Sequence, residues 1–277
     1  MKLSLSVRVV EKFQAKREAS MGLGELADLA AAHGYRAVCM RASQLGIQTP
    51  AATVRSEGEG LRRRGLAVSM VTGDFPIPEN SDDEGPQALR NITPYLDLAA
   101  TLEADLLRIC MKREEDITWA QRAADEAGER GMRLAHQCHT RSLFEEVEAA
   151  LDVIGRVRRD NFGIIYEPAN LELCGQPYGA EVIRAFAPHL FNVYLQNHRI
   201  HSGGDTALTT WNHGSVQFDQ LPMWEVGGVD FASIMEGLAA VGYEGYVTVH
   251  QAFAGVAGPE DAVGKSAEYL RSIGPFD

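Results

Sequence analysis

The feature that most constrains the fold of this chain is an eightfold alternation of strand-like and helix-like segments. Short runs of β-forming residues recur along the whole sequence, and helical patterns lie between them. Repeated strand–helix alternation predicts parallel strands joined by helical crossovers. The expected strands are residues 3–7, 35–40, 66–71, 105–111, 132–137, 162–167, 190–196 and 245–251.

The helical patterns carry apolar residues at the spacing of one buried helix face. In residues 23–33 these are Leu23, Leu26, Ala27 and Ala30, and further helices are expected over 88–102 and 118–130. An amphipathic helix after a strand must pack its apolar face on the sheet. The sequence therefore predicts a sheet covered by helices.

A closed (β/α)8 barrel is the expected architecture, because a chain of 277 residues with eight strand–helix units has the usual size of such a barrel. The alternative, a doubly wound open sheet, usually has a glycine-rich loop after the first strand. The stretch "SVRVVEKFQ" at 6–14 contains no glycine. No change of composition marks a domain boundary, so we predict a single α/β domain, a TIM barrel, over residues 1–277.

Charge and composition exclude several classes of partner. The net charge is −12, which disfavours nucleic-acid binding, since that requires a basic surface. No run of eighteen apolar residues and no signal peptide is recognisable, so no membrane partner is expected. The four cysteines lack CxxC spacing and indicate buried thiols in a reducing, cytoplasmic compartment.

Polar residues end the last four expected strands. Strand ends of parallel barrels meet at one face, where active sites lie, so we expect these residues to form one site. Strand alternation places Gln137 and His139 on the inner face, and His136 and Cys138 toward the helices. The strand-end residues are Gln137, His139, Glu167, Asn170, Gln196, Asn197, His198, His250 and Gln251, with Arg41 and Lys112 after strands two and four.

Three segments resemble the sugar phosphate isomerase/epimerase superfamily, the xylose-isomerase-like barrels. The most specific is "GGVDFASIMEGLAAVGYEGYVTVHQAF" at 227–253, which is similar to the closing segment of that family. "NFGIIYEPANL" at 161–171 resembles its sixth strand, and "GMRLAHQCH" at 131–139 its fifth. The resemblance extends over essentially the whole chain and is specific for the superfamily, but not for a substrate.

The resemblance implies one divalent metal ion held by four side chains: Glu on strand five, Asp on strand six, His or Gln on strand seven, and Glu on strand eight. All four matching positions differ from the usual residue. The metal ligands predicted in this way are Glu167, His250, Gln196 and Gln137. On strand seven the matching position is Tyr194, but its phenol is a weaker ligand than the neighbouring Gln196. His139 competes with Gln137 for the position on strand five. A site with imidazole and one carboxylate favours Mn, Zn, Co or Fe over Mg.

The resemblance also implies catalysis beside a carbonyl group, where family epimerases use two glutamates as bases. Only one acid is kept here, so the predicted catalytic residues are His139, His250 and Glu167. The first hypothesis is an isomerase or epimerase of a keto sugar or related polyhydroxy carbonyl compound acting through an enediolate. The second is a lyase, either a keto-polyol dehydratase or an enzyme that eliminates from a 3-keto-glycoside. The third is a non-catalytic sugar-binding relative.

Substrate contacts are expected from the strand ends and from residues 199–228, an irregular segment predicted to cover the barrel mouth. The partner is a small carbohydrate, and the oligomeric state stays open, a homo-oligomer included. Arg8, Arg41, Lys112 and Arg199 suit an anionic group, but no glycine-rich phosphate loop accompanies them, so a phosphorylated substrate is not predicted. The predicted substrate-binding residues are Asn170, Asn197, His198, Arg199, Trp211, His213, Lys112 and Arg41.

Overall fold

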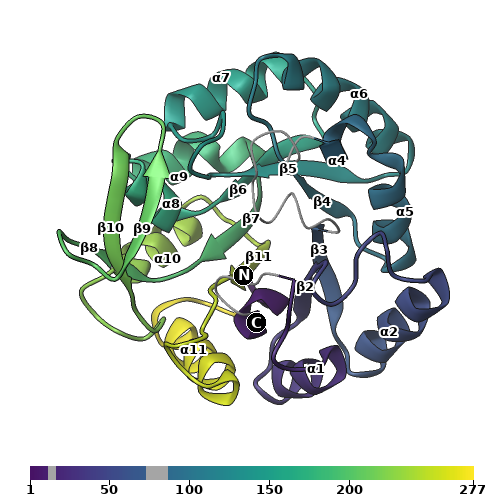
Figure 1. The fold of residues 1–277 in the computed structure, drawn as a ribbon, viewed down its shortest axis with the longest axis horizontal. Helices are drawn as coiled ribbons and strands as arrows, with labels where there is room; N and C mark the ends of the chain where they lie inside the picture. The colour runs from purple at the N-terminus through teal and green to yellow at the C-terminus, as the bar shows by residue number, and fades with distance from the viewer. Residues whose placement is uncertain (12–16, 73–86) are drawn as a thin grey trace.

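Eight parallel strands close into a barrel in the computed structural model, which describes residues 1–11, 17–72 and 87–277 (Figure 1). Their order around the barrel is β1-β11-β7-β6-β5-β4-β3-β2. Each overlaps one predicted strand, so the (β/α)8 prediction is confirmed. The strands are β1 (Lys2–Ser6), β2 (Ala37–Arg41), β3 (Ala67–Thr72), β4 (Leu106–Ile109), β5 (Arg133–Gln137), β6 (Phe162–Tyr166), β7 (Leu190–Leu195) and β11 (Tyr246–Val249).

Helices surround the barrel, as the amphipathic patterns predict (Figure 1). The single helix expected over 88–102 is divided in two between Arg90 and Thr93, because Pro94, in the first turn of the second helix, lacks the amide hydrogen that would bond the carbonyl oxygen of Arg90. The helices are α1 (Leu23–Ala32), α2 (Ala51–Arg63), α4 (Gln87–Arg90), α5 (Thr93–Thr101), α6 (Glu115–Glu129), α7 (Val147–Val157), α8 (Pro168–Leu173), α9 (Ala180–Phe186), α10 (Phe231–Ala240) and α11 (Pro259–Ile273), with 3-10 turns η1 (Val7–Val10) and η2 (Ala187–His189).

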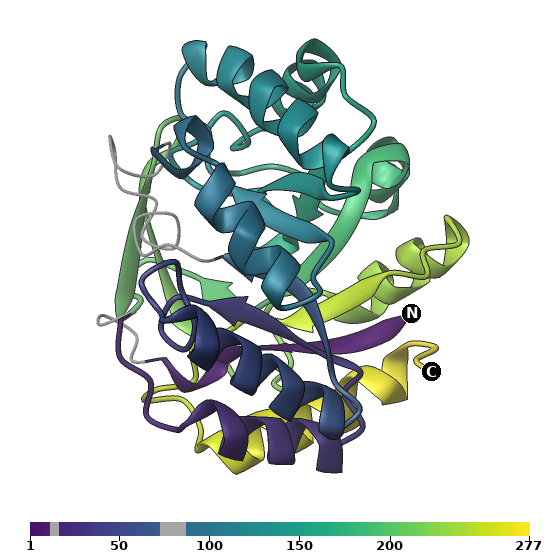
Figure 2. The same cartoon turned by 90° about the vertical axis from the view of Figure 1, so that its right-hand side faces the viewer.

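The barrel closes between its first and last strands, β1 and β11. Leu3 pairs with Val247 and Leu5 with Val249 in a parallel register. The carboxyl ends of both strands therefore face the same end of the barrel. Figure 2 shows the two termini of the chain at the opposite end.

Alternation along β5 separates the barrel interior from the helix layer. Ala135 belongs to the small apolar cluster inside the barrel. His136 points outward and stacks on Phe144 with a centroid distance of 4.1 Å. Cys138 likewise lies in the outer core, as the alternation predicts. All four cysteines are buried and unbridged, and no helix in the described part of the chain is long and apolar enough to cross a membrane.

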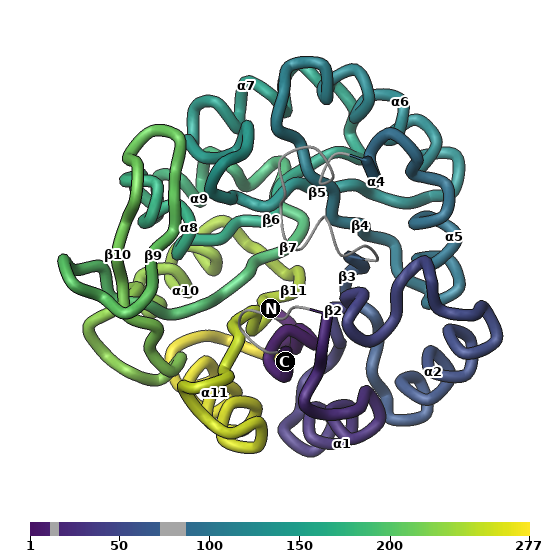
Figure 3. The backbone as a smooth tube through the Cα atoms, viewed as in Figure 1, coloured from purple at the N-terminus to yellow at the C-terminus, as the bar shows by residue number. Residues whose placement is uncertain are grey.

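Residues 198–220 form an antiparallel sheet where the sequence predicted an irregular segment. The strands β8 (His198–Ile200), β9 (Thr206–Thr210) and β10 (Gly214–Gln220) pair in the order β8-β10-β9. Gly214, with φ of 65°, allows the tight turn between β9 and β10. The many exposed polar residues of this segment obscure the alternation of apolar and polar residues that predicts a strand. The course of this hairpin beside the end of β7 can be followed in Figure 3.

Candidate active site

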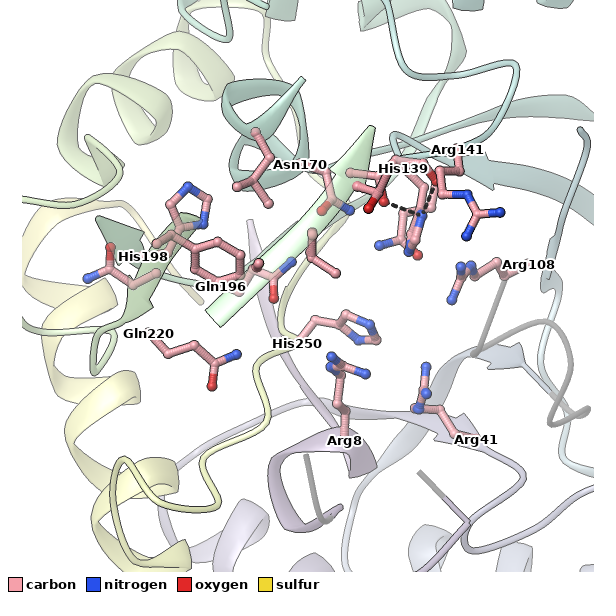
Figure 4. A pocket seen from close by; sticks show the side chains of 18 residues that line it. Arg8, Arg41, Arg108, His139, Arg141, Asn170, Gln196, His198, Gln220 and His250 are labelled. Carbon is pink, nitrogen blue, oxygen red and sulfur yellow. Dashed lines mark hydrogen bonds between the residues drawn. The ribbon is translucent and has the colours of Figure 1, made fainter. Parts of the chain in front are cut away.

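A cavity of about 430 Å³ lies at the carboxyl ends of the barrel strands, bounded on one side by β9 and β10 (Figure 4). Residues at or after the ends of β5, β7 and β11 contribute amides and imidazoles, and arginines come from η1, β2, β4 and the segment after β5. The lining residues are Arg8, Arg41, Arg108, Gln137, His139, Thr140, Arg141, Asn170, Leu173, Gln196, Asn197, His198, Ala207, Leu208, Thr209, Phe218, Gln220 and His250.

Glu167, at the end of β6, is completely buried behind the amides of this cavity. Its Oε2 accepts hydrogen bonds from Gln137 Nε2 and, at 2.7 Å, from Asn170 Nδ2, while its Oε1 accepts from Gln196 Nε2. Burial raises the pKa of Glu167 to about 7, although the amide donors and the positive charge of Arg108 oppose the shift. A carboxyl group with this pKa changes its protonation state near neutral pH.

Three histidines line the cavity, and two of them, His139 and His250, follow the barrel strands β5 and β11. His139 Nδ1 lies 2.8 Å from the carbonyl oxygen of Thr140, which can only accept, so Nδ1 carries a proton and Nε2 carries the lone pair in the neutral ring. The ring of His250 stacks on Tyr194 with a centroid distance of 3.6 Å, and its Nδ1 lies 3.0 Å from Ser6 Oγ. Burial and the charges of Arg41 and Arg8 lower the pKa of His250 well below its ordinary value, so this ring is neutral at pH 7.

Arginines gather on one side of the cavity, around His250 (Figure 4). Arg41 is 1% exposed and donates from Nε to Glu11 Oε1 at 2.8 Å, but its two Nη atoms have no hydrogen-bond partner among the described residues. Arg108 is buried, and its Nε also lacks a partner in the described part of the chain. Burial and the charge of Arg41 lower the pKa of Arg8 to about 10, so its guanidinium stays charged at neutral pH.

Most residues predicted for the site are brought together at this cavity. Asn197 lines it, but its side chain bonds the backbone of Pro222, Glu225 and Val229, and so it holds the turn that precedes α10. His198 Nε2 pairs with Glu172 at 2.9 Å. The predicted residues that line the cavity are His139, His250, Gln137, Gln196, Asn170, Asn197, His198 and Arg41, with Glu167 directly behind the amides.

Four predicted substrate contacts lie outside the cavity lining. The Trp211 residue is 49% exposed at the hairpin turn, and the His213 ring lies against Gly175. Arg199 is exposed on β8. Lys112 is buried, and its backbone N–H donates to Asp116.

Sequence reasoning missed Arg108, which occupies the middle of β4. A signal for it exists in the strand pattern. Arg108 has the same parity as Leu106, which points into the barrel, so the charge falls on the inner face of an apolar strand. Thr140, Arg141 and Gln220 also line the cavity without having been predicted, and they lie beyond or outside the expected barrel strands.

The buried carboxylate of Glu145 anchors the β9–β10 turn to the barrel. It accepts backbone hydrogen bonds from Trp211 at 2.8 Å and from Asn212 at 3.3 Å across the gap between the hairpin and the segment before α7. It also accepts from the backbone of Arg141 at 2.6 Å. One side chain therefore positions both the hairpin and a residue of the cavity wall.

We expect Glu145→Ala to raise KM about tenfold with a smaller change in kcat, because hydrogen bonds to a buried charged acceptor are lost and the hairpin detaches. Glu146→Ala is the matched control, since this neighbouring carboxylate accepts from the Asn212 side chain at 2.7 Å and, within the described residues, from no backbone N–H of the hairpin. Steady-state kinetics and limited proteolysis of the 206–220 segment measure the effect. Equal behaviour of the two variants would show that the anchor does not position the hairpin.

The family model of the xylose isomerase-like TIM barrel matches residues 27–273, and the chain belongs to this family. Solved structures share its fold at low sequence identity. The probable 3-DHS dehydratase AsbF of Bacillus anthracis is 14% identical with a TM-score of 0.74, over 98% of this chain and 99% of that one. A D-allulose 3-epimerase of Methylomonas sp., in complex with D-allulose, is 15% identical with a TM-score of 0.70, over 99% and 97%.

A further structural relative carries a metal ion. This xylose isomerase-like protein of Mycobacterium smegmatis, in complex with magnesium, is 14% identical with a TM-score of 0.69, over 98% of this chain and 96% of that one. No curated protein matches the chain significantly. The solved structures that share the fold include epimerases and a probable dehydratase.

The residues at the predicted metal positions fit a divalent cation poorly. No cluster of three or more His, Cys, Asp or Glu suited to a metal occurs in the described ranges. Gln137 and Gln196 present amide nitrogens, not oxygens, to the carboxylate of Glu167. Burial and the nearby arginines lower the pKa of His250, and the positive charge of these arginines also disfavours a dication bound to this ring. We therefore derive no catalytic step through a metal.

Proposed function

We propose that this chain is an enzyme that moves a proton beside the carbonyl group of a small polyhydroxy compound, as an isomerase or epimerase. The observation that carries the proposal is the presence of two imidazoles, His139 and His250, on the wall of one cavity. Positioned imidazoles accept and return protons at neutral pH. The lone pair on His139 Nε2 suits this group to act as a base. His250 is neutral, and because burial and the nearby arginines disfavour its protonation it is the weaker base of the two.

Glu167 serves in this proposal as a positioning residue, because the amides of Gln137 and Gln196 lie between its carboxylate and the cavity. By accepting their N–H groups it sets the direction of both amides. The buried carbonyl oxygen of Gln137 has no partner among the described residues and can accept a substrate hydroxyl. The carboxylate thus orients the groups that would hold the polyol.

A lyase is the second candidate, and the single carboxylate favours it. Symmetric proton transfer between two carboxylates, as in the epimerases that the sequence resembles, cannot operate with Glu167 alone. Elimination needs a base beside the carbonyl and an acid for the leaving group, and His139 can fill both roles by taking the proton beside the carbonyl and giving it, as imidazolium, to the leaving oxygen. A dehydratase or a 3-keto-glycoside-eliminating enzyme fits this requirement.

Incubation of the purified protein with keto sugars, keto-polyols and 3-keto-glycosides in D₂O tests the proposal. We expect deuterium beside the carbonyl in a product of unchanged formula for an isomerase, and loss of water or aglycone for a lyase. Parallel reactions with a chelator and with added Mn²⁺, Co²⁺ or Zn²⁺ should proceed at equal rates, given the poor fit for a cation. Binding without any deuterium exchange would contradict the proposal and indicate a sugar-binding relative.

A further inference from the structure

We infer that the cavity takes substrates with a negatively charged group, a carboxylate or a phosphate monoester, and that Arg8, Arg41 and Arg108 bind this group. The inference rests on the proposed function and specifies its substrate class. Arg8 and Arg41 were named from the sequence as groups able to bind an anion, although a phosphorylated substrate was not predicted; Arg108 was not named.

The first argument is the charge balance of the cavity wall. Four arginines line it, Arg8, Arg41, Arg108 and Arg141, in a chain of net charge −12. Two buried carboxylates, Glu11 and Glu167, contact residues of the wall. Glu11 accepts hydrogen bonds from Arg41 at 2.8 Å and from Ser43 at 2.7 Å. Glu167 is held by three amides. The wall therefore carries an excess positive charge that a bound anion would neutralise.

The second argument is the set of buried donors without partners. These are both Nη atoms of Arg41 and the Nε atoms of Arg8 and Arg108, each unpaired in the described part of the chain. A buried donor without an acceptor costs free energy, so such groups are usually paired in native proteins. Carboxylate and phosphate oxygens match the fork of guanidinium donors better than any neutral group does.

The third argument is the placement of the arginines relative to the rest of the wall. Arg8 comes from η1, Arg41 from the end of β2 and Arg108 from β4, whereas the amides come from the later strands. Figure 4 shows the three arginines on one side, Gln196 and Gln220 on the other, and His250 between them. A substrate with its anionic end at the arginines would place its hydroxyl groups at the amides and its middle carbons beside His250.

Calorimetry with three matched probes tests the inference without requiring turnover. The probes are a six-carbon polyol, the aldonic acid of the same carbon skeleton and the corresponding sugar phosphate, at constant ionic strength. We expect the acid, the phosphate or both to bind at least about tenfold more tightly than the polyol. The tighter of the two charged probes identifies the anionic group. Equal affinity for all three would overturn the inference.

Arg108→Gln is the variant of choice, because no hydrogen bond of Arg108 to another described residue is lost. We expect it to weaken binding of the charged probe about tenfold, to leave polyol binding unchanged, and to raise Tm or leave it unaltered by relieving repulsion from Arg8 and Arg41. Arg184→Gln, an exposed residue of α9, makes the same charge change away from the cavity. Arg8→Gln is a second variant if the first does not fold.

Unchanged affinity of the charged probe in folded Arg108→Gln or Arg8→Gln protein would overturn the inference. Failure of the proposed function has a different signature. In that case the wild-type protein would bind the charged probe in an arginine-dependent manner and still show no deuterium exchange. Tight arginine-dependent binding with exchange would support both.

Discussion

Replacing Glu167 with Gln is expected to lower kcat/KM about a hundredfold or more, with a correctly folded barrel. A Gln side chain presents one N–H₂ group to amides that already donate, so at least one of Gln137, Asn170 and Gln196 loses its acceptor and turns away. Misplaced substrate contacts reduce rates by this order even when they are not at the reacting atoms. Glu148→Gln, on the exposed face of α7, is the control with the same chemical change.

The pH dependence distinguishes this positioning role from a simple packing role. The wild-type kcat/KM should rise as pH increases through about 7, because the ionised carboxylate of Glu167 is the form that accepts all three donors. The ordinary pKa of 4.5 in the unfolded chain is lower, so the folded protein binds the extra proton between about pH 4.5 and 7. The free energy of unfolding should therefore fall as pH rises through this range. Both trends should be absent in Glu167→Gln.

The second large effect is expected for His139→Asn, with a loss of kcat of about 10²- to 10⁴-fold and little change in KM. Asparagine keeps an N–H donor for the carbonyl of Thr140 but has no group that accepts a proton near neutral pH. Single-turnover kinetics and the deuterium-exchange rate measure the loss. His213→Asn is the control, since that ring packs against Gly175 outside the cavity.

The opposite result would assign the proton transfer to the other imidazole. If His139→Asn retains exchange while His250→Asn loses it, His250 is the acid/base group and His139 belongs to the substrate wall. The stacking of His250 on Tyr194 makes a structural effect of its replacement measurable as a fall in Tm, which separates loss of packing from loss of chemistry.

The sequence by itself determined the barrel, because strand and helix periodicities are local properties of the chain. Each strand was placed within a few residues, and alternation along β5 correctly directed Gln137 inward and His136 outward. The rule that parallel strand ends meet at one face then located the amides and histidines at the strand ends of the cavity wall. Pro94 in the sequence also signals the helix break before it, but the continuous pattern of apolar residues over 88–102 led to the prediction of a single helix.

Only the tertiary structure decided what kind of ion the cavity suits. Arg8, Arg41 and Arg108 lie on three different elements, and each alone reads as an ordinary polar residue. Their combined effect depends on mutual distance and on exclusion from water, because charges interact strongly only when they are close and poorly solvated. The same holds for Glu167, whose partners come from β5, α8 and the end of β7. A metal-ligand position can be inferred from the sequence of one strand. Whether the neighbouring side chains offer hydrogen-bond donors or lone pairs at that position depends on how separate strands bring them together.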